Sequence, residues 1–354
     1  MMLCMRRLAI VLVCLLAAGA CSSSSDETSS SDGASEAAAS AGATSTTVAA
    51  PVELPPSAGC DATAPVAPGQ TEERLLSGGV ERTYIREVPA AEEPVPLVLD
   101  FHGYSEGSAV HVQMSELPAF GAEQGFVTLV PQGLGEPSRW DVALDSPDLD
   151  FVGDLLDEAE RTLCIDRSRV YATGLSNGAF MTSSVACRYA DRVAAIAPVA
   201  GIRDPEGCDP VRPVPILAIH GTDDQFVTYE GGLGERALDL PAPDGSGRTL
   251  REVGVEGRPP GEPSVPEIVA SWAARYDCGD AGPPTPITED VDAIVHRCPA
   301  GVAVELLRVE GGGHSWPGSA LSAAIESIVG PTTTTISANE QLWAFFQDHP
   351  LPVG

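Results

Sequence analysis

Short, continuous apolar runs recur along this chain, and amphipathic segments separate them. Six runs end in glycine or polar turn residues, at 96–103, 126–131, 169–174, 193–198, 214–220 and 302–309. Runs of this length are typical of strands buried on both faces, as in a parallel sheet. Helix-like segments follow at 151–163, 179–189, 267–276 and 338–347, and residues 81–88 alternate as an antiparallel entry strand does. This alternation predicts an α/β fold with a mostly parallel sheet.

The first residues have the composition of an export signal. Arg6 and Arg7 precede an apolar run over 8–18, which is too short to span a membrane. Small residues then lead to Cys21, and the junction resembles a bacterial lipoprotein cleavage box, although a larger residue is usual where Ala18 stands. We expect residues 1–20 to be a lipoprotein signal peptide and Cys21 to carry lipid. The alternative is an ordinary signal peptide with an incidental cysteine.

The segment 21–56 differs in composition from everything after it. Ser, Ala and Thr dominate this segment until Pro51–Pro56, so it cannot bury enough apolar area to offset its ordering entropy. We expect a disordered tether there and a single catalytic domain over 57–354. Within that domain, residues 231–266 are rich in Gly and Pro. We interpret them as an excursion near the site; the alternative is a surface insertion without a role.

Charge limits the partners of the chain. The formal net charge is −30, and the 20 basic residues are all arginine. No basic face is available to neutralise phosphates, so nucleic acid is excluded as a partner, and electrostatic docking on anionic lipid is disfavoured. Membrane contact is therefore expected through the N-terminal lipid only. The exported protein would lie on the outer face of the bacterial cell membrane or be secreted.

Six of the nine cysteines remain once the signal peptide and Cys21 are set aside. An even number in an exported protein predicts three disulfides. A zinc site is the rival interpretation, but the sequence has no CxxC and no close Cys/His cluster, so we predict no metal and no cofactor. Of the 15 possible connectivities, proximity favours Cys278–Cys298 and Cys187–Cys208, which leaves Cys60–Cys164.

Two GxSxG sequences, around Ser105 and Ser176, match the turn that exposes a nucleophilic serine between a strand and a helix. Ser176 follows a predicted buried strand and precedes a helix of small residues. Ser105 is followed by Glu106, whose carboxylate would oppose the negative charge that develops at an oxyanion. We therefore predict that Ser176 is the nucleophile and that the stretch 102–107 supplies an oxyanion N–H.

The partners of such a serine follow it in the order acid, then histidine, each just beyond a strand. Asp223 and Asp224 follow the run 214–220, and spacing alone does not choose between them. His314 lies in a glycine-rich turn after the run 302–309. Because the carboxyl ends of parallel strands meet at one edge of a sheet, these groups are expected to converge.

The remaining histidines and two tryptophans have simpler interpretations. His102 and His220 each precede a glycine at a strand end and are expected to fix turns by hydrogen bonds. No constellation surrounds His111. Trp140 and Trp316 are possible substrate-pocket residues, and packing beneath the loops is the alternative for both.

Four stretches together resemble the polyhydroxybutyrate depolymerase / feruloyl esterase family, and in particular its secreted, LpqC-like lipoprotein esterases. The resemblance covers roughly residues 60–350 apart from the excursion, and its motifs are at 169–179, 195–201, 220–227 and 311–318. It implies an α/β-hydrolase fold, with helices on both faces of the sheet, and carboxylic-ester hydrolysis.

The resemblance also assigns residues. The family's HGTxDxxV pattern places the acid at Asp224, and the oxyanion donors fall on the backbone N–H groups of Tyr104 and Asn177. The expected substrates are polyhydroxyalkanoate-type, feruloyl-type or other small esters. The alternatives are a serine peptidase or acyltransferase with the same triad, or an envelope lipoprotein that binds without catalysis.

Overall fold

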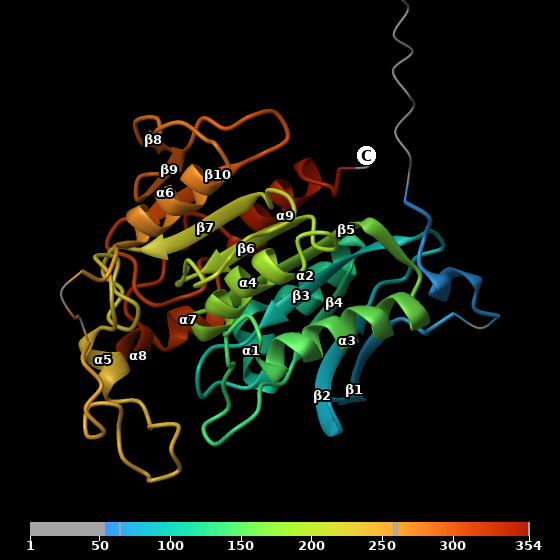
Figure 1. The fold of residues 1–354 in the computed structure, drawn as a ribbon, viewed down its shortest axis with the longest axis horizontal. Helices are drawn as coiled ribbons and strands as arrows, with labels where there is room; N and C mark the ends of the chain where they lie inside the picture. Colours follow the sequence, from blue (N-terminus) through green and yellow to red (C-terminus); the bar gives the residue numbers. More distant parts are fainter. Residues whose placement is uncertain (1–53, 64, 258, 260, 353–354) are drawn as a thin grey trace, which may run out of the picture. The chain divides into compact units, whose positions relative to one another are not determined.

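The residues that the structure describes, 54–352 apart from 64, 258 and 260, contain one ten-stranded sheet, and the seven predicted strands are among its ten (Figure 1). The structure is a computed structural model. Its strands are β1 (Gly69–Ser77), β2 (Val80–Val88), β3 (Val95–Phe101), β4 (Val127–Pro131), β5 (Ile165–Leu175), β6 (Ala195–Val199), β7 (Ile216–Gly221), β8 (Thr285–Pro286), β9 (Val291–Val295) and β10 (Val304–Val309). The predicted signal peptide 1–20, Cys21 and most of the tether 21–56 lie outside the described residues and stay predictions.

The sheet order is β1-β2-β4-β3-β5-β6-β7-β10-β9-β8. From β4 to β10 every neighbouring pair is parallel, whereas the strands at both margins pair antiparallel. The six central strands are those that the apolar runs predicted. The carboxyl ends of β3, β5, β7 and β10 therefore share one edge of the sheet, where loops carry the candidate site residues.

Helices cover both faces of the sheet, which confirms the predicted α/β architecture. They are α1 (Ser108–Ser115), α2 (Leu117–Gln124), α3 (Pro147–Thr162), α4 (Asn177–Arg188), α5 (Glu235–Leu238), α6 (Val265–Arg275), α7 (Ala320–Ala324), α8 (Glu326–Val329) and α9 (Ala338–Asp348), with a short 3-10 helix at Ala58–Asp61. None of these described helices has the length and apolar character needed to cross a membrane.

Alternate strand residues enter two separate cores. Leu97 and Leu99 of β3 pack with the apolar sides of α3, α4 and α6, whereas Val98 between them packs with α1, α2 and α9. The same alternation holds in β7 and β10. Strands buried on both faces need no polar residues, which is why they appear in the sequence as unbroken apolar runs.

The long helix α3 shows how local sequence sets these elements. Ser146 caps it by accepting a hydrogen bond from the Leu149 amide, and Pro147 occupies its first turn. Acidic residues in that turn and Arg161 in the last turn match the helix dipole. The helix therefore begins at Pro147, four residues before the expected residue 151. Hydrophobic periodicity alone does not identify the capping residue, so it placed the start too late.

Three disulfides join described cysteines that are 104, 21 and 20 residues apart in the sequence. They are Cys187–Cys208 and Cys278–Cys298, which proximity in the sequence favoured, and Cys60–Cys164, the pair that these two leave. Disulfides persist in oxidising compartments, so this pattern is that of an exported protein.

Candidate active site

Ser176 occupies a sharp turn between β5 and α4. Its φ and ψ are 58° and −117°, a left-handed conformation that is uncommon for a residue other than glycine. Its amide is held by Val199 O at 3.0 Å. The two motif glycines are required by close packing, because a Cβ at Gly174 or Gly178 would lie 2.6 or 2.0 Å from Phe101 O. The sequence therefore brings α4 against the end of β3 with Ser176 at the apex.

His314 and Asp224 lie at the ends of β10 and β7 and contact each other directly. His314 Nδ1 is 2.7 Å from Asp224 Oδ2, and both side chains are buried. The Phe226 ring stacks on the imidazole at a centroid distance of 4.8 Å. The His314 amide donates to Val329 O at 2.6 Å, which anchors the glycine-rich turn. The Ser176 hydroxyl forms no hydrogen bond with another described residue.

The second oxygen of Asp224 is also occupied. Oδ1 accepts hydrogen bonds from the amides of Phe226 at 2.7 Å and Val227 at 3.0 Å, so the carboxylate closes its own turn. His220 Nε2 lies 2.8 Å from Val227 O, as expected for a histidine that fixes a turn. Asp223, the competing acid, is exposed. Geometry therefore pairs Asp224, rather than Asp223, with the histidine.

Two backbone amides beside Ser176 are available to a ligand. A Cβ built on Gly103 would lie 3.7 Å from Ser176 Cβ, so the loop after β3 runs alongside the serine. The Tyr104 amide, next in that loop, donates to no described residue. Asn177 is the first residue of α4, so its N–H has no acceptor in a preceding turn. Free N–H groups of this kind are the donors that an oxyanion needs.

The chain is similar in sequence to known esterases. No protein-family model matches the chain. Feruloyl esterase B of Piromyces equi is 28% identical over 235 residues, which are 63% of this chain and 40% of the relative. The inferred esterase NocK of Nocardia uniformis subsp. tsuyamanensis is 27% identical over 309 residues, 81% of this chain and 83% of the relative.

A bifunctional acetylxylan esterase/xylanase of Neocallimastix patriciarum is 30% identical over 135 residues, 38% of this chain and 20% of the relative. This chain is similar in sequence to feruloyl and acetylxylan esterases. It spans less than half the length of the two fungal relatives. The solved acetyl xylan esterase of Aspergillus awamori superposes with a TM-score of 0.50 at 14% identity, covering 73% of this chain and 98% of that one. The chain thus has the α/β-hydrolase fold.

Burial chooses between the two interpretations of Trp140 and Trp316, and it rules against their role as substrate-pocket residues. Trp140 and Trp316 have only 3% and 1% of their surface exposed, so neither offers a face to a substrate. Their indole N–H groups donate to His102 O at 2.9 Å and Asn339 Oδ1 at 3.0 Å. Packing beneath the loops is therefore their role. Trp140 also fixes the Asn177 side chain, which accepts a hydrogen bond from the Trp140 amide at 2.7 Å.

The structure confirms the expectation for His102 and contradicts the one for His111. His102 Nδ1 lies 2.7 Å from Gly103 O, and its Nε2 accepts from the Gly133 amide at 2.9 Å, so it fixes a turn as expected. Burial lowers the pKa of His102 to about 4, which keeps it neutral. The expectation that His111 stands alone is wrong, because it is buried between two carboxylates, Asp100 and Glu106.

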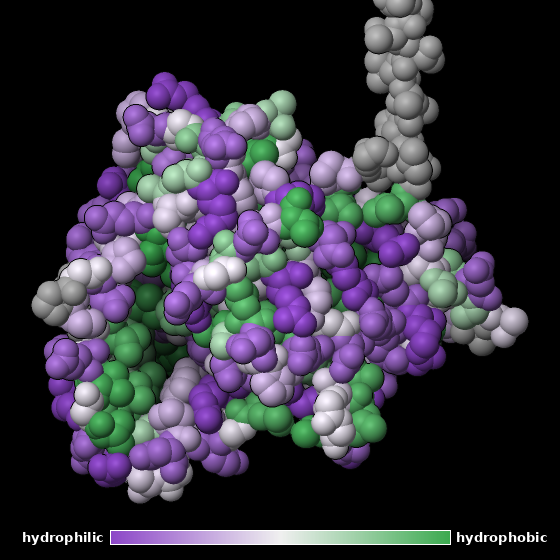
Figure 2. Space-filling view, in the orientation of Figure 1, coloured by the Kyte–Doolittle hydropathy of each residue, from purple (hydrophilic) through white to green (hydrophobic). Residues whose placement is uncertain are grey.

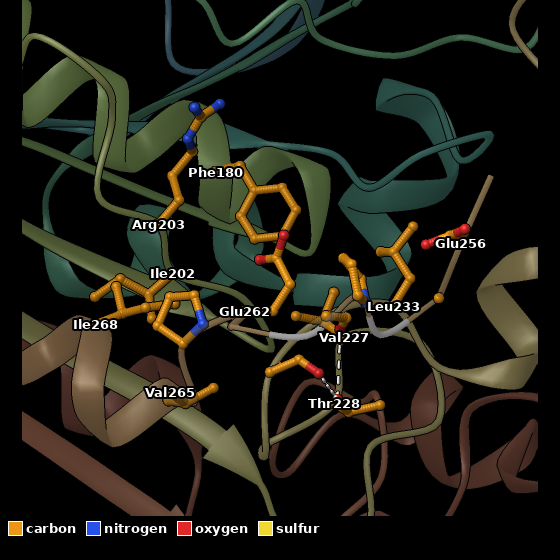
Figure 3. A pocket seen from close by; sticks show the side chains of 15 residues that line it. Phe180, Ile202, Arg203, Val227, Thr228, Leu233, Glu256, Glu262, Val265 and Ile268 are labelled. Carbon is orange, nitrogen blue, oxygen red and sulfur yellow. Dashed lines mark hydrogen bonds between the residues drawn. The ribbon is translucent and has the colours of Figure 1, made fainter.

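A pocket opens beside the elbow and is closed on one side by the excursion 231–266. Its volume is about 280 Å³, and its walls are mainly apolar: Phe180, Ile202, Val227, Leu233, Val265 and Ile268. Phe180 lies one helical turn beyond Ser176, whose carbonyl accepts its amide hydrogen bond at 3.0 Å. Figure 2 shows a hollow with hydrophobic walls at the left of the view, beside the excursion. Figure 3 shows Phe180 and Glu262 directed toward each other across the pocket, with Arg203 beyond the ring.

The described residues contain no group of three or more His, Cys, Asp or Glu side chains arranged to hold a metal ion.

Proposed function

We propose that this chain is a serine carboxylic-ester hydrolase with Ser176 as the nucleophile. The observation that carries the proposal is the buried hydrogen bond of 2.7 Å between His314 and Asp224, at the strand edge where the half-buried Ser176 occupies its sharp turn. A serine, a histidine oriented by an acid, and free amides beside the serine are the parts that acyl transfer requires.

In the proposed mechanism, His314 Nε2 takes the Ser176 proton as the hydroxyl attacks the ester carbonyl. Asp224 holds the proton of His314 on Nδ1, which leaves Nε2 free to accept, and it stabilises the imidazolium that forms. The amides of Tyr104 and Asn177 donate to the tetrahedral oxyanion. The alcohol leaves with the proton from His314, and water then hydrolyses the acyl-enzyme by the same steps.

The pocket bears on which esters are accepted. Its apolar walls suit a planar or aliphatic group of moderate size, and the names of the relatives indicate feruloyl and acetyl groups. We propose small feruloyl-type or acetyl esters as substrates, with the larger group in this pocket. Hydroxyalkanoate oligomers are included as a comparison substrate. The resemblance to polyhydroxybutyrate depolymerases rests on motifs outside the excursion 231–266, which forms part of the pocket wall.

The experiment that tests this proposal compares methyl ferulate with methyl acetate, using the full chain. Ile268→Trp places an indole in the pocket. It is expected to raise KM for methyl ferulate about tenfold and to change KM for methyl acetate less than about twofold. Ile287→Trp is the matched control, because Ile287 is 43% exposed between β8 and β9 and does not line the pocket, so KM should stay unchanged for both substrates.

A peptide anilide and an added acyl acceptor complete the panel. Faster turnover of the anilide would indicate a peptidase, and transfer to the acceptor in preference to water would indicate an acyltransferase. Equal effects of Ile268→Trp on both esters would contradict the assignment of the larger group to this pocket.

We also propose that Cys21 anchors the chain to the cell membrane through lipid. The three disulfides support export, and the export signal in the sequence ends at this cysteine. Cys21→Ser is expected to abolish incorporation of labelled palmitate and to move the protein from the membrane fraction to the medium. Retention of both label and membrane association in that variant would refute the anchor.

A further inference from the structure

A buried network of charged side chains lies beneath the loop that follows β3. Glu106, which the sequence places beside Ser105, is turned inward, and only 9% of its side chain is exposed. Its Oε2 accepts a hydrogen bond from the Gly103 amide at 2.6 Å. Both carboxylate oxygens lie 3.2 Å from His111 Nδ1. The buried Glu106 carboxylate therefore holds the loop that carries the Tyr104 amide through a hydrogen bond to Gly103.

His111 joins this carboxylate to a second one. Its Nε2 lies 2.7 Å from Asp100 Oδ1, and Asp100 Oδ2 accepts from Ser115 Oγ at 2.7 Å. Because both ring nitrogens face carboxylates, only the imidazolium satisfies both contacts. Burial opposes that charge, but Asp100 and Glu106 outweigh it and raise the pKa of His111 to about 10.

The Gly103 residue is held on both of its peptide groups. Its amide donates to Glu106, and its carbonyl accepts from His102 Nδ1 at 2.7 Å. This carbonyl belongs to the same peptide plane as the Tyr104 N–H. Fixing Gly103 at both ends therefore fixes the direction in which the Tyr104 N–H points, beside Ser176.

We propose that Glu106, held in place by His111 and Asp100, is a positioning residue that aims the Tyr104 amide at the developing oxyanion. The inference rests on the proposed esterase function and deepens it. The carboxylate acts through its hydrogen bond to Gly103 rather than through its charge. A bare carboxylate near the oxyanion would destabilise the transition state, and the His111 imidazolium offsets that charge locally.

Three substitutions at Glu106 distinguish the effect of side-chain length from the effect of the negative charge. Gln keeps an oxygen at the same distance and removes the charge, Asp keeps the charge but shortens the side chain by a methylene, and Leu removes both. We expect kcat on p-nitrophenyl butyrate to fall about 30-fold to 100-fold in Glu106→Leu and about tenfold in Glu106→Asp, with KM within about threefold of native. Glu106→Gln is expected to retain kcat within about fivefold.

Two readouts distinguish positioning from a loss of fold. Active sites are counted by fluorophosphonate labelling, and kcat is expressed per labelled site. Inhibition by butylboronic acid, whose tetrahedral adduct occupies the oxyanion site, should weaken in proportion to the loss of kcat/KM. Glu305→Gln and Glu305→Leu, at the opposite end of β10 from His314, are matched controls expected to leave kcat unchanged.

The outcomes differ for the two ideas. A native protein that neither turns over esters nor reacts with the fluorophosphonate overturns the proposed function and this inference with it. Native-like kcat per site in both Glu106→Leu and Glu106→Asp overturns the inference alone. The inference is also overturned if Glu106→Asp retains more activity than Glu106→Gln. The charge at residue 106, rather than the length of its side chain, would then position the loop.

Discussion

Ser176→Ala should remove ester hydrolysis almost completely: we expect kcat on p-nitrophenyl butyrate to fall by about 10⁴-fold to 10⁶-fold. The variant keeps the elbow, because alanine is no larger than serine and the strained backbone is held by the Val199 carbonyl and by the packing of Gly174 and Gly178. What disappears is the oxygen that forms the acyl-enzyme. The residual rate reports the oxyanion donors and substrate binding alone.

The measurement is steady-state turnover together with mass spectrometry of the protein after fluorophosphonate treatment. Ser105→Ala is the matched control, since Ser105 occupies the other GxSxG sequence and is exposed in the loop before α1. It should keep both labelling and native-like turnover. Undiminished hydrolysis by Ser176→Ala would contradict the nucleophile assignment, and absence of labelling at Ser176 in the native protein would favour a binding protein without catalysis.

The central strands were predictable because burial on both faces leaves unbroken apolar runs in the sequence. The margins of the sheet were less visible. β1 is half exposed and carries Glu72, Glu73 and Arg74, so neither continuous apolarity nor clean alternation marks it. The start of the central strand β5 was not visible either: it begins at Ile165, four residues before its apolar run, because Ile165 already pairs with Val95 of β3. Tertiary pairing, rather than local composition, defines those ends.

Within the site, sequence order and strand ends predicted which residues approach one another. Asp224 and His314 are 90 positions apart, yet each directly follows a buried strand, and neighbouring parallel strands bring such positions together. The network of Asp100, Glu106 and His111 gave no comparable signal. Its members come from a strand, a loop and a helix, and among 50 acidic residues a single carboxylate carries little information.

The two tryptophans illustrate a different limit of sequence reasoning. An aromatic residue near a catalytic loop is equally compatible with a pocket wall and with packing beneath the loop. The choice depends on where the side chain points, which tertiary contacts decide. Here the indole of Trp140 lies against Phe101 at a centroid distance of 5.4 Å, in the core rather than the pocket.

Asp224→Asn is the second change with a large expected effect, and we expect kcat to fall about 10³-fold to 10⁴-fold while KM changes little. The amide oxygen of asparagine can still accept from the Phe226 and Val227 amides, so the turn after β7 should persist. Its NH₂ group then faces His314 Nδ1, which must become the acceptor. The imidazole proton moves to Nε2, and His314 can no longer take the proton of Ser176.

The control for this change is Asp223→Asn, which alters the neighbouring exposed carboxylate by the same atoms and should leave kcat within about twofold. Near-native turnover by Asp224→Asn would mean that the carboxylate only closes the turn through Phe226 and Val227 and that His314 is oriented without it. If turnover were lost in Asp223→Asn alone, Asp223 rather than Asp224 would be the acid that orients the histidine. Because the two aspartates are adjacent but only Asp224 contacts the imidazole, comparing them isolates that one hydrogen bond.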